Sequence, residues 1–326
     1  MTSSPPLPAA AGPSSAAVTA HLAGRVQDLT RVRPGSADPV GLDVQLALYV
    51  CYELAYRGFQ GVDPRWEWDA DLIGLRSRLE QVFLDHLRDC AGDTGGISAA
   101  EEMRRLTAKS DDVGGPAHFL HHHGTWQQMR EYFVHRSLYH LKEGDPHAWA
   151  IPRLIGQAKA AFVAVEFDEY GAGHAAHMDQ RLFAELMAAA ELDDTYLANL
   201  GAVPAVSLTV VNLMSMFGLH RSLRGAAVGH FAAAGITSPP YSRRLADALE
   251  GMDAPGPCTK FYREHACVPE NDMAFEVVGD LLEAEPELNE DVVFGIRAHD
   301  IVENRLAEHM LKSWAAEETS LLQALS

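Results

Sequence analysis

The sequence predicts an all-α protein, and three observations support this prediction. Runs that alternate Val, Ile or Thr with polar residues and end in Asn-Gly turns are almost absent. Long windows instead repeat apolar residues at helical spacing. No internal repeat and no long linker divides the 326 residues. We therefore expect one helical domain over 116–326, preceded by an N-terminal helical extension over 39–115 and a disordered tail over 1–38.

The tail comes first along the chain. Residues 1–24 contain no Lys or Arg and crowd Pro5, Pro6, Pro8 and Pro13 together. A secretory signal needs a basic start and an unbroken apolar stretch, and neither is present. Segments with this composition favour disorder, because they bury too little apolar surface to offset the entropy of ordering.

The next two elements show helical periodicity most clearly. Residues 39–58 end at Gly58 and place these apolar side chains on one face: Leu42, Leu46, Tyr49, Val50 and Leu54. Residues 70–91 repeat the pattern with Leu72, Leu75, Leu79, Val82, Phe83 and Leu87. Both windows predict amphipathic helices in the N-terminal extension.

Further helices are expected over 98–111, 116–142, 151–170, 177–191, 193–219, 221–235, 240–251, 258–283 and 288–317. Pro152 suits a first helical turn, and Asp193 has the chemistry of an N-cap. Pro-Gly punctuation over 254–257 separates two helices. The most apolar run, 202–219, contains Asn212 and several hydroxyl side chains. It therefore predicts a buried core helix rather than a membrane span.

The composition narrows the classes of function. With 26 Lys+Arg against 45 Asp+Glu, the formal charge is −19, which argues against nucleic acid or an anionic membrane as a partner. The four cysteines are scattered without a CxxC motif, so a disulfide scaffold or a thiolate zinc site is not expected. Such cysteine usage predicts a cytoplasmic protein. Sixteen histidines beside many carboxylates leave open a metal held by nitrogen and oxygen ligands.

The densest group of metal-binding residue types lies between 131 and 183. Glu131/His135 and Glu143/His147 are each spaced by four, which brings both side chains to one helix face. Acidic, His-rich helices also meet this spacing by chance. The motif DEYGAGH, over 168–174, is more specific, because its glycines would break or widen a helix beside charged residues.

Two further groups are candidates for chemistry. In 261–276, His265, Asp272 and Glu276 fall on roughly one helical face, although Pro269 would interrupt that helix. In 217–230, His220 and Arg224 precede small residues and could hold a substrate carboxylate, because a guanidinium donates two parallel hydrogen bonds. Arg224 could equally pair with a carboxylate of this acidic chain. No nucleotide-binding loop, GxSxG elbow or HExxH motif is present.

Four blocks together carry a resemblance to a known family: HRSLYHLKEGDPHAWAIPRL, DEYGAGHAAHMDQRLF, NLMSMFGLHRSLRGAAVGH and FYREH. The chain resembles the bacterial iron-containing redox enzymes with a haem-oxygenase-like fold, the haem-oxygenase-like di-iron oxidases. The resemblance runs from about Asp43 to Trp314. It implies a haem-oxygenase-like helical bundle, two irons that activate O₂, and oxidation of amino-acid-like or fatty-acid-like substrates, with N-oxygenases of specialised metabolism in the same branch. A homodimer is also implied.

The resemblance also implies metal ligands, and this sequence departs from that set. Glu143, Glu169 and His265 match family ligands, and Asp179 stands where the family has His. Gly235 and Pro269 fall on ligand positions that they cannot fill, and Asp272 falls on the final His. A small shift of register near Pro269 would move Asp272 onto the family Asp. His174 or His177 could supply an imidazole near Asp179.

Two hypotheses follow. In the first, the chain is an oxidoreductase with an altered non-haem iron site, one iron held firmly or two weakly, acting with O₂ on a small amino-acid-like substrate. Its metal ligands would be Glu143, Glu169, Asp179, His265 and Asp272; Glu169 and His265 would also be catalytic, and Arg224 and His220 would bind substrate. In the second, the chain binds no metal. It would then be a cofactor-independent catalyst using His265 or His174, or a non-catalytic partner of an intact paralogue.

Overall fold

The structure is a computed structural model that describes residues 4–25, 27–110, 114–266 and 270–325; the side chains of residues 36, 110 and 270–272 are also outside the description. Every regular element in these residues is a helix, which confirms the predicted all-α class. The α-helices are α1 Pro13–Leu22, α2 Leu42–Glu53, α3 Ala70–Ala91, α4 Ala99–Ser110, α5 Gly115–His122, α6 Trp126–His140, α7 Asp145–Ala148, α8 Gly156–Glu169, α9 Asp179–Ala189, α10 Ala205–Leu219, α11 Arg224–Gly251, α12 Gly256–His265, α13 Glu270–Ala284 and α14 Asn289–Ala315.

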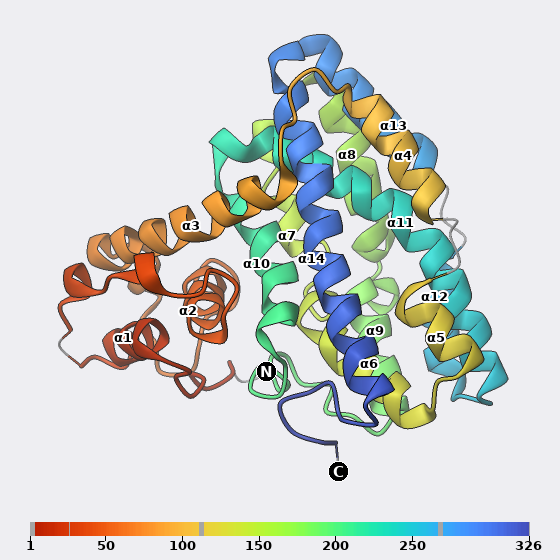
Figure 1. Ribbon diagram of the computed structural model, residues 1–326, viewed down its shortest axis with the longest axis horizontal. Coiled ribbons are helices and arrows are strands. Elements are labelled where there is room, and N and C mark those ends of the chain that lie inside the picture. The colour runs from red at the N-terminus through yellow and green to blue at the C-terminus, as the bar shows by residue number, and fades with distance from the viewer. Residues whose placement is uncertain (1–3, 26, 111–113, 267–269, 326) are drawn as a thin grey trace.

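Two long helices, α11 and α14, form the centre of the bundle (Figure 1). Glycines allow their close approach: a Cβ at Gly229 would lie 2.1 Å from the carbonyl oxygen of Val292, and one at Gly295 would lie 2.1 Å from that of Ala226. The apolar helix α10 packs on both, and its residues from Ser207 to Gly218 are buried, as the sequence predicts. Helices α12 and α13 also pack against α11.

The N-terminal helices α1, α2 and α3 lie at one side of this bundle (Figure 1). Helix α2 packs on α1, α3 and α10, so it connects the extension to the main core. The predicted helices 39–58 and 70–91 are present as α2 and α3, and Asp69 caps α3 by accepting a hydrogen bond from the backbone N–H of Leu72 at 2.9 Å. The boundary at residue 115 stays a prediction.

The prediction of a disordered tail over 1–38 is wrong for part of that segment. Residues 13–22 form α1, which packs on α2 and buries Val18 and Leu22. Asp43 fixes the start of α1, because its carboxylate accepts hydrogen bonds from the backbone N–H groups of Ser14 and Ser15 at 2.9 and 2.8 Å. This contact between distant residues orders a segment whose local composition favours disorder.

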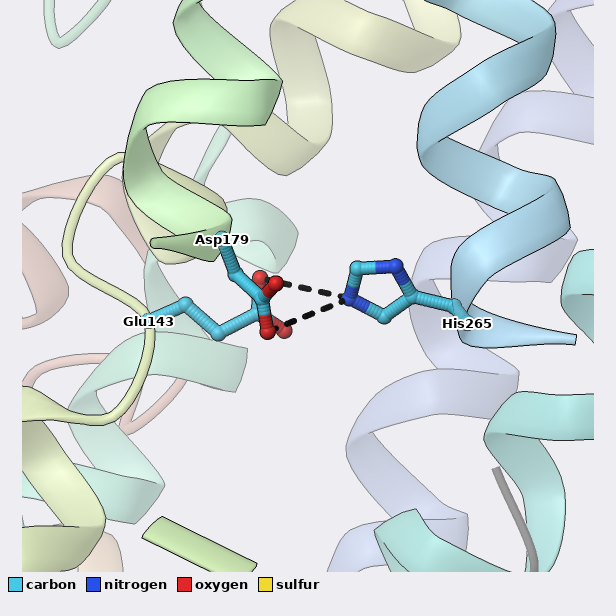
Figure 2. A group of neighbouring side chains, drawn as sticks. All are labelled: Glu143, Asp179 and His265. Carbon is cyan, nitrogen blue, oxygen red and sulfur yellow. Dashed lines mark ion pairs between the residues drawn. The ribbon is translucent and has the colours of Figure 1, made fainter. Parts of the chain in front are cut away.

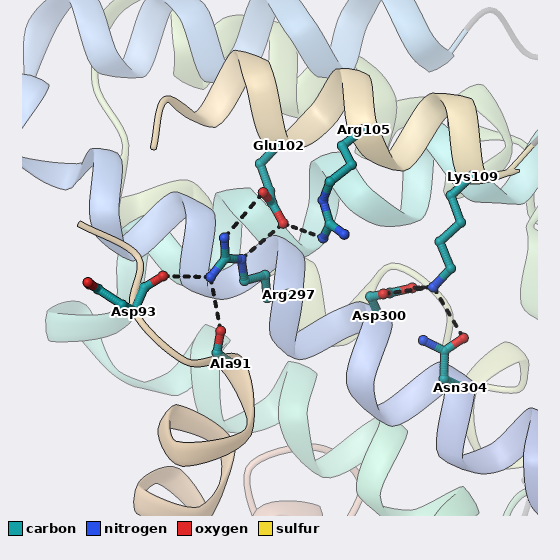
Figure 3. A network of polar contacts seen from close by, with 8 residues as sticks. All are labelled: Ala91, Asp93, Glu102, Arg105, Lys109, Arg297, Asp300 and Asn304. Atoms are coloured by element: carbon teal, nitrogen blue, oxygen red, sulfur yellow. Dashed lines mark hydrogen bonds and ion pairs between the residues drawn. The ribbon is translucent and has the colours of Figure 1, made fainter. Parts of the chain in front are cut away.

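Helix α4 is fastened to α14 by polar contacts (Figure 3). Arg297 on α14 donates to Glu102 on α4 at 3.0 Å and to the carbonyl oxygens of Ala91 and Asp93 at 3.0 and 2.7 Å. One turn further along, Lys109 donates to both oxygens of Asp300 at 2.6 and 2.8 Å. These contacts join the end of the N-terminal extension to the bundle.

Three predicted helices begin or divide differently. The segment 116–142 is two helices, because Gly124 follows α5 and Thr125 starts α6 with a capping box. The segment 193–219 is helical only from Ala205, after Pro204. The segment 258–283 is divided into α12 and α13; Pro269 lies outside the described residues.

The predicted break between 221–235 and 240–251 is absent, because α11 continues through Pro239 and Pro240. Each proline removes a backbone donor, and its ring crowds the carbonyl four residues earlier. Helix α11 packs on α12, α13 and α14 along its length. This packing holds the helix continuous across two residues that would end an isolated helix.

Within the described ranges, none of the helices is both long enough and apolar enough to cross a membrane.

Candidate metal centre

A short non-helical turn places Glu143 in the interior. Helix α6 ends at His140 and α7 begins at Asp145, and between them Gly144 adopts the left-handed region at φ 85°. Glycine reaches this region without the steric cost of a Cβ. The side chain of Glu143 is therefore buried, and it lies beside residues from two other helices.

Those residues are Asp179, the first residue of α9, and His265, the last residue of α12. His265 Nε2 lies 3.9 Å from Glu143 Oε2 and 3.6 Å from Asp179 Oδ2, and Figure 2 shows both carboxylates facing the imidazole. One ligand atom from each of the three lies within 4.8 Å of the others. We call Glu143, Asp179 and His265 group A.

The charges in group A are set by burial and by one further histidine. Burial favours a neutral Glu143, but the hydrogen bond from His140 Nδ1 at 2.7 Å stabilises its carboxylate and lowers its pKa. Burial and the negative charge of Glu143 raise the pKa of Asp179 to about 7. Metal coordination requires a deprotonated carboxylate, so binding of a cation would displace the proton of Asp179.

A second group of possible metal ligands lies on α7 and α8. His147 on α7 and Glu166 and Glu169 on α8 each offer a ligand atom within 4.8 Å of the others. We call these three residues group B. His147 follows Glu143 by four residues, and Glu169 follows Glu166 by three. The second spacing brings both glutamates to one face of α8. The turn at Gly144 separates Glu143 from His147, so this pair does not lie on one helix as the sequence predicts.

Group B contains buried polar atoms without a hydrogen bond in the described structure. Both carboxylate oxygens of Glu166 and Nδ1 of His147 have no such partner there. Burial, with repulsion from Asp145 and Glu143, raises the pKa of Glu166 to about 8. Burial also lowers the pKa of His147 to about 4, so its imidazole is neutral, the form that binds metals. An unpartnered buried carboxylate calls for a cation, because its desolvation is otherwise uncompensated.

The glycines of the DEYGAGH motif end α8 directly after Glu169. Gly171, Ala172 and Gly173 all have positive φ, of 65°, 50° and 82°. A Cβ at Gly171 would lie 2.6 Å from the carbonyl carbon of His177. This tight turn confirms the predicted helix break and brings the start of α9, with Asp179, back beside α8.

Five of the six residues of groups A and B line one cavity of about 370 Å³. Its lining includes residues of group A and of group B: Glu143, His147, Glu169, Asp179 and His265. Gly235, at the position where the resemblance implies a Glu, also lines it. The volume is within the range of small-molecule sites in proteins.

The structure thus brings together three of the five predicted metal ligands, Glu143, Asp179 and His265, and places Glu169 in the neighbouring group. The side chain of Asp272 lies outside the described residues. His174 and His177 are exposed and belong to neither group, although His177 lines the cavity.

The two residues proposed to bind substrate lie elsewhere. Arg224 pairs with Glu285, and His220 Nε2 lies 3.0 Å from Glu80 Oε1. Neither lines the cavity beside groups A and B. For Arg224, the structure shows the alternative that the sequence left open, a pair with a carboxylate of the chain itself.

The two Glu/His pairs noted in the sequence have different surroundings. Glu131 accepts hydrogen bonds from Trp314, Thr319 and Ser320, and His135 lies between two serines. This pair holds the C-terminal segment. The other pair, Glu143 and His147, contributes one residue to each metal-binding group.

His147 and Glu166 were not among the predicted ligands. The spacing of Glu143 and His147 was a signal for the first, and the Glu166–Glu169 spacing could have pointed to the second. Neither spacing was distinctive, because an acidic, His-rich chain contains many similar spacings.

The donor set suits a transition metal such as iron, because groups A and B offer imidazole and carboxylate ligands only. A comparison with models of protein families matches residues 130–302 to the iron-containing redox enzymes, which are haem-oxygenase-like. The chain belongs to that family. No curated protein matches the sequence.

The matched region of this iron-containing redox enzyme contains every residue of groups A and B. Family membership confirms the resemblance and the haem-oxygenase-like helical bundle. It also supports a general oxidoreductase role and makes iron the first metal to consider at these two groups.

Proposed function

We propose that this chain is an O₂-dependent oxidoreductase that holds non-haem iron at groups A and B and oxidises a small organic molecule. The observation that carries the proposal is the pair of three-residue, nitrogen-and-oxygen groups, of which every residue except Glu166 lines one cavity. Two ligand positions of the family fall on Gly235 and Pro269, which cannot bind a metal. In this proposal, His147 and Glu166 replace these two donors in part.

In this proposal, Glu143, Asp179 and His265 hold one ion, and His147, Glu166 and Glu169 hold the other. Iron, when bound, would supply the capacity to react with O₂ and accept electrons from the substrate. The chain supplies the rest: His140 orients the carboxylate of Glu143 by its hydrogen bond. Burial keeps His147 neutral, and Asp179 and Glu166 release protons when a cation binds.

The substrate follows less directly. The family resemblance suggests an amino-acid-like molecule from specialised metabolism. Arg224, the residue expected to hold its carboxylate, lies in an ion pair with Glu285. The amino-acid class therefore rests on the resemblance alone.

Iron content tests this proposal. The protein is produced with iron, desalted without O₂ and analysed for metal, and its O₂ uptake is then measured. We expect the wild type to retain iron and Asp179→Ala to retain less. Glu185→Ala is the matched control, because Glu185 lies on the same helix, α9, in an exposed surface pair with Arg181.

Iron retention by Asp179→Ala equal to that of Glu185→Ala, or a wild type without iron, would overturn the proposal. The second outcome would favour a metal-free member, either a cofactor-independent catalyst or a partner of an intact paralogue.

A further inference from the structure

A second cavity, also of about 370 Å³, lies on the other side of group A. It is lined by residues of α4, α5, α6, α11, α12 and α14. Tyr139, Glu143, Ser238 and His265 line both this cavity and the first one. Group A therefore lies between the two cavities, and a molecule in the second cavity would be next to the metal-binding residues.

The walls of this second cavity are rich in aromatic rings: Tyr132, Tyr139, Tyr241, Phe261 and Tyr262. Several of these rings contact one another: Phe261 and Tyr262 meet edge to face, with centroids 5.0 Å apart, and Tyr132 and Tyr241 are 6.2 Å apart. Such walls offer both ring faces and ring edges. They are suited to an aromatic ligand, which gains offset-stacked and edge-to-face contacts there.

Two cations of the cavity are paired with carboxylates. Arg136 donates to both carboxylate oxygens of Glu303 at 2.8 and 2.6 Å. Lys109 donates to both carboxylate oxygens of Asp300 (Figure 3). A charged ligand that used Arg136, Glu303, Lys109 or Asp300 would have to break one of these pairs, so this part of the lining favours a neutral molecule.

The buried polar atoms of the lining that lack a hydrogen-bond partner within the described ranges include Tyr262 Oη and His299 Nδ1. The side chains are almost fully buried, at 2% and 6% exposure. Buried polar groups normally have partners, so these two atoms mark a place where a ligand can supply one. A hydroxyl or carbonyl oxygen of a ligand can accept a hydrogen bond from Tyr262 Oη.

We infer that the second cavity binds a neutral molecule with one aromatic ring and one hydroxyl or carbonyl oxygen, and that this molecule is the substrate. The substrate role rests on the proposed function. The binding itself does not, because it depends on the tyrosines, His299 and the paired charges and needs no metal.

Binding of three small probes to the purified full chain, measured by calorimetry without added metal, tests the inference. The first probe, 4-methylphenol, has both the ring and the oxygen. Toluene lacks the oxygen, and 4-methylcyclohexanol lacks the aromatic ring. We expect 4-methylphenol to bind at least about 3- to 10-fold more tightly than toluene, the value of one hydrogen bond, and more tightly than 4-methylcyclohexanol.

Tyr262→Phe should weaken binding of 4-methylphenol by about 3- to 10-fold and leave binding of toluene within about 2-fold. Tyr52→Phe is the matched control, because Tyr52 is equally buried and lines neither cavity. It should change neither probe, and circular dichroism shows whether both variants fold. If Tyr262→Phe does not fold, the comparison of the three probes on the wild type remains as the test.

The inference is overturned if 4-methylphenol does not bind, if 4-methylcyclohexanol binds as tightly, or if folded Tyr262→Phe binds 4-methylphenol like the wild type. Failure of the proposed function is a separate result, because it is a loss of iron retention. A chain that binds 4-methylphenol but no iron would keep the binding site and lose its assignment as an oxidase substrate site.

Discussion

Lys142 and Glu53 form an ion pair in the interior that joins the N-terminal extension to the turn carrying Glu143. The exposed fractions of the two side chains are 1% and 0%, and Nζ lies 3.0 Å from Oε2 of Glu53. Tyr196 donates its hydroxyl to the same carboxylate at 2.8 Å. The ammonium also lies over the rings of Tyr49 and Tyr56, 4.6 and 4.4 Å from their centroids.

Replacing Lys142 with Met removes the cation and leaves the carboxylate of Glu53 buried, with the hydroxyl of Tyr196 and the backbone N–H of Arg57 as its remaining donors. Breaking a buried ion pair from one side costs about 3–5 kcal/mol, because the other charge stays uncompensated. Loss of the two cation–π contacts adds about 1 kcal/mol. Since the tyrosine hydroxyl still stabilises the carboxylate, we expect Lys142→Met to lower the free energy of unfolding by about 4 kcal/mol.

Urea unfolding followed by circular dichroism measures this loss. The double variant Lys142→Met, Glu53→Gln should recover at least half of it, because no buried charge remains. Lys260→Met is the control: Lys260 is 55% exposed and pairs with Glu264 at 3.7 Å, so its loss should cost no more than about 0.5 kcal/mol. A loss below about 1 kcal/mol for Lys142→Met, or a double variant as unstable as the single one, would refute the reasoning.

Three further predictions follow from the same structure. Gly295→Ala should lower the unfolding free energy by about 3 kcal/mol or more in thermal unfolding, because the new Cβ would meet the carbonyl oxygen of Ala226 at 2.1 Å; stability within 1 kcal/mol of wild type would contradict this packing. The pKa of Glu166 is raised from 4.5 to about 8 in the fold, so the free energy of unfolding of the metal-free protein should fall as the pH rises from about 5 to 8. Glu166→Gln should therefore become the more stable of the two proteins toward pH 8. If their unfolding free energies change with pH in parallel, this carboxyl is not buried as described. Arg224→Met should leave iron retention unchanged while costing about 1 kcal/mol, because Arg224 pairs with Glu285 away from both cavities; loss of iron would show that the arginine acts on the metal centre.

Much of the fold could be predicted from the sequence, because strong apolar periodicity identifies a helix from its own residues. The failures have a common cause in contacts between distant residues. Asp43 caps a helix in the segment expected to be disordered. Packing against neighbouring helices keeps α11 continuous through Pro239 and Pro240. Neither effect is visible in a local window of sequence.

The candidate site was also predicted in part from the sequence, and the rest depends on contacts between distant residues. The family resemblance led to Glu143, Asp179 and His265, which the structure places together, although their role as ligands stays a prediction. The position of Arg224 before small residues was equally suggestive of a substrate site, but a guanidinium pairs with whichever carboxylate the fold brings near it. Glu166 carried no distinctive local signal, and only its burial without a partner singles it out.

In the proposed function, groups A and B each hold one metal ion. An anaerobic titration of the metal-free protein with Fe(II), followed by equilibrium dialysis, counts the ions directly. We expect two ions per chain for the wild type and one ion each for His265→Ala and Glu166→Ala, with His309→Ala, outside both groups, retaining two. A wild type that binds no Fe(II), or variants that bind as many ions as the wild type, would contradict it.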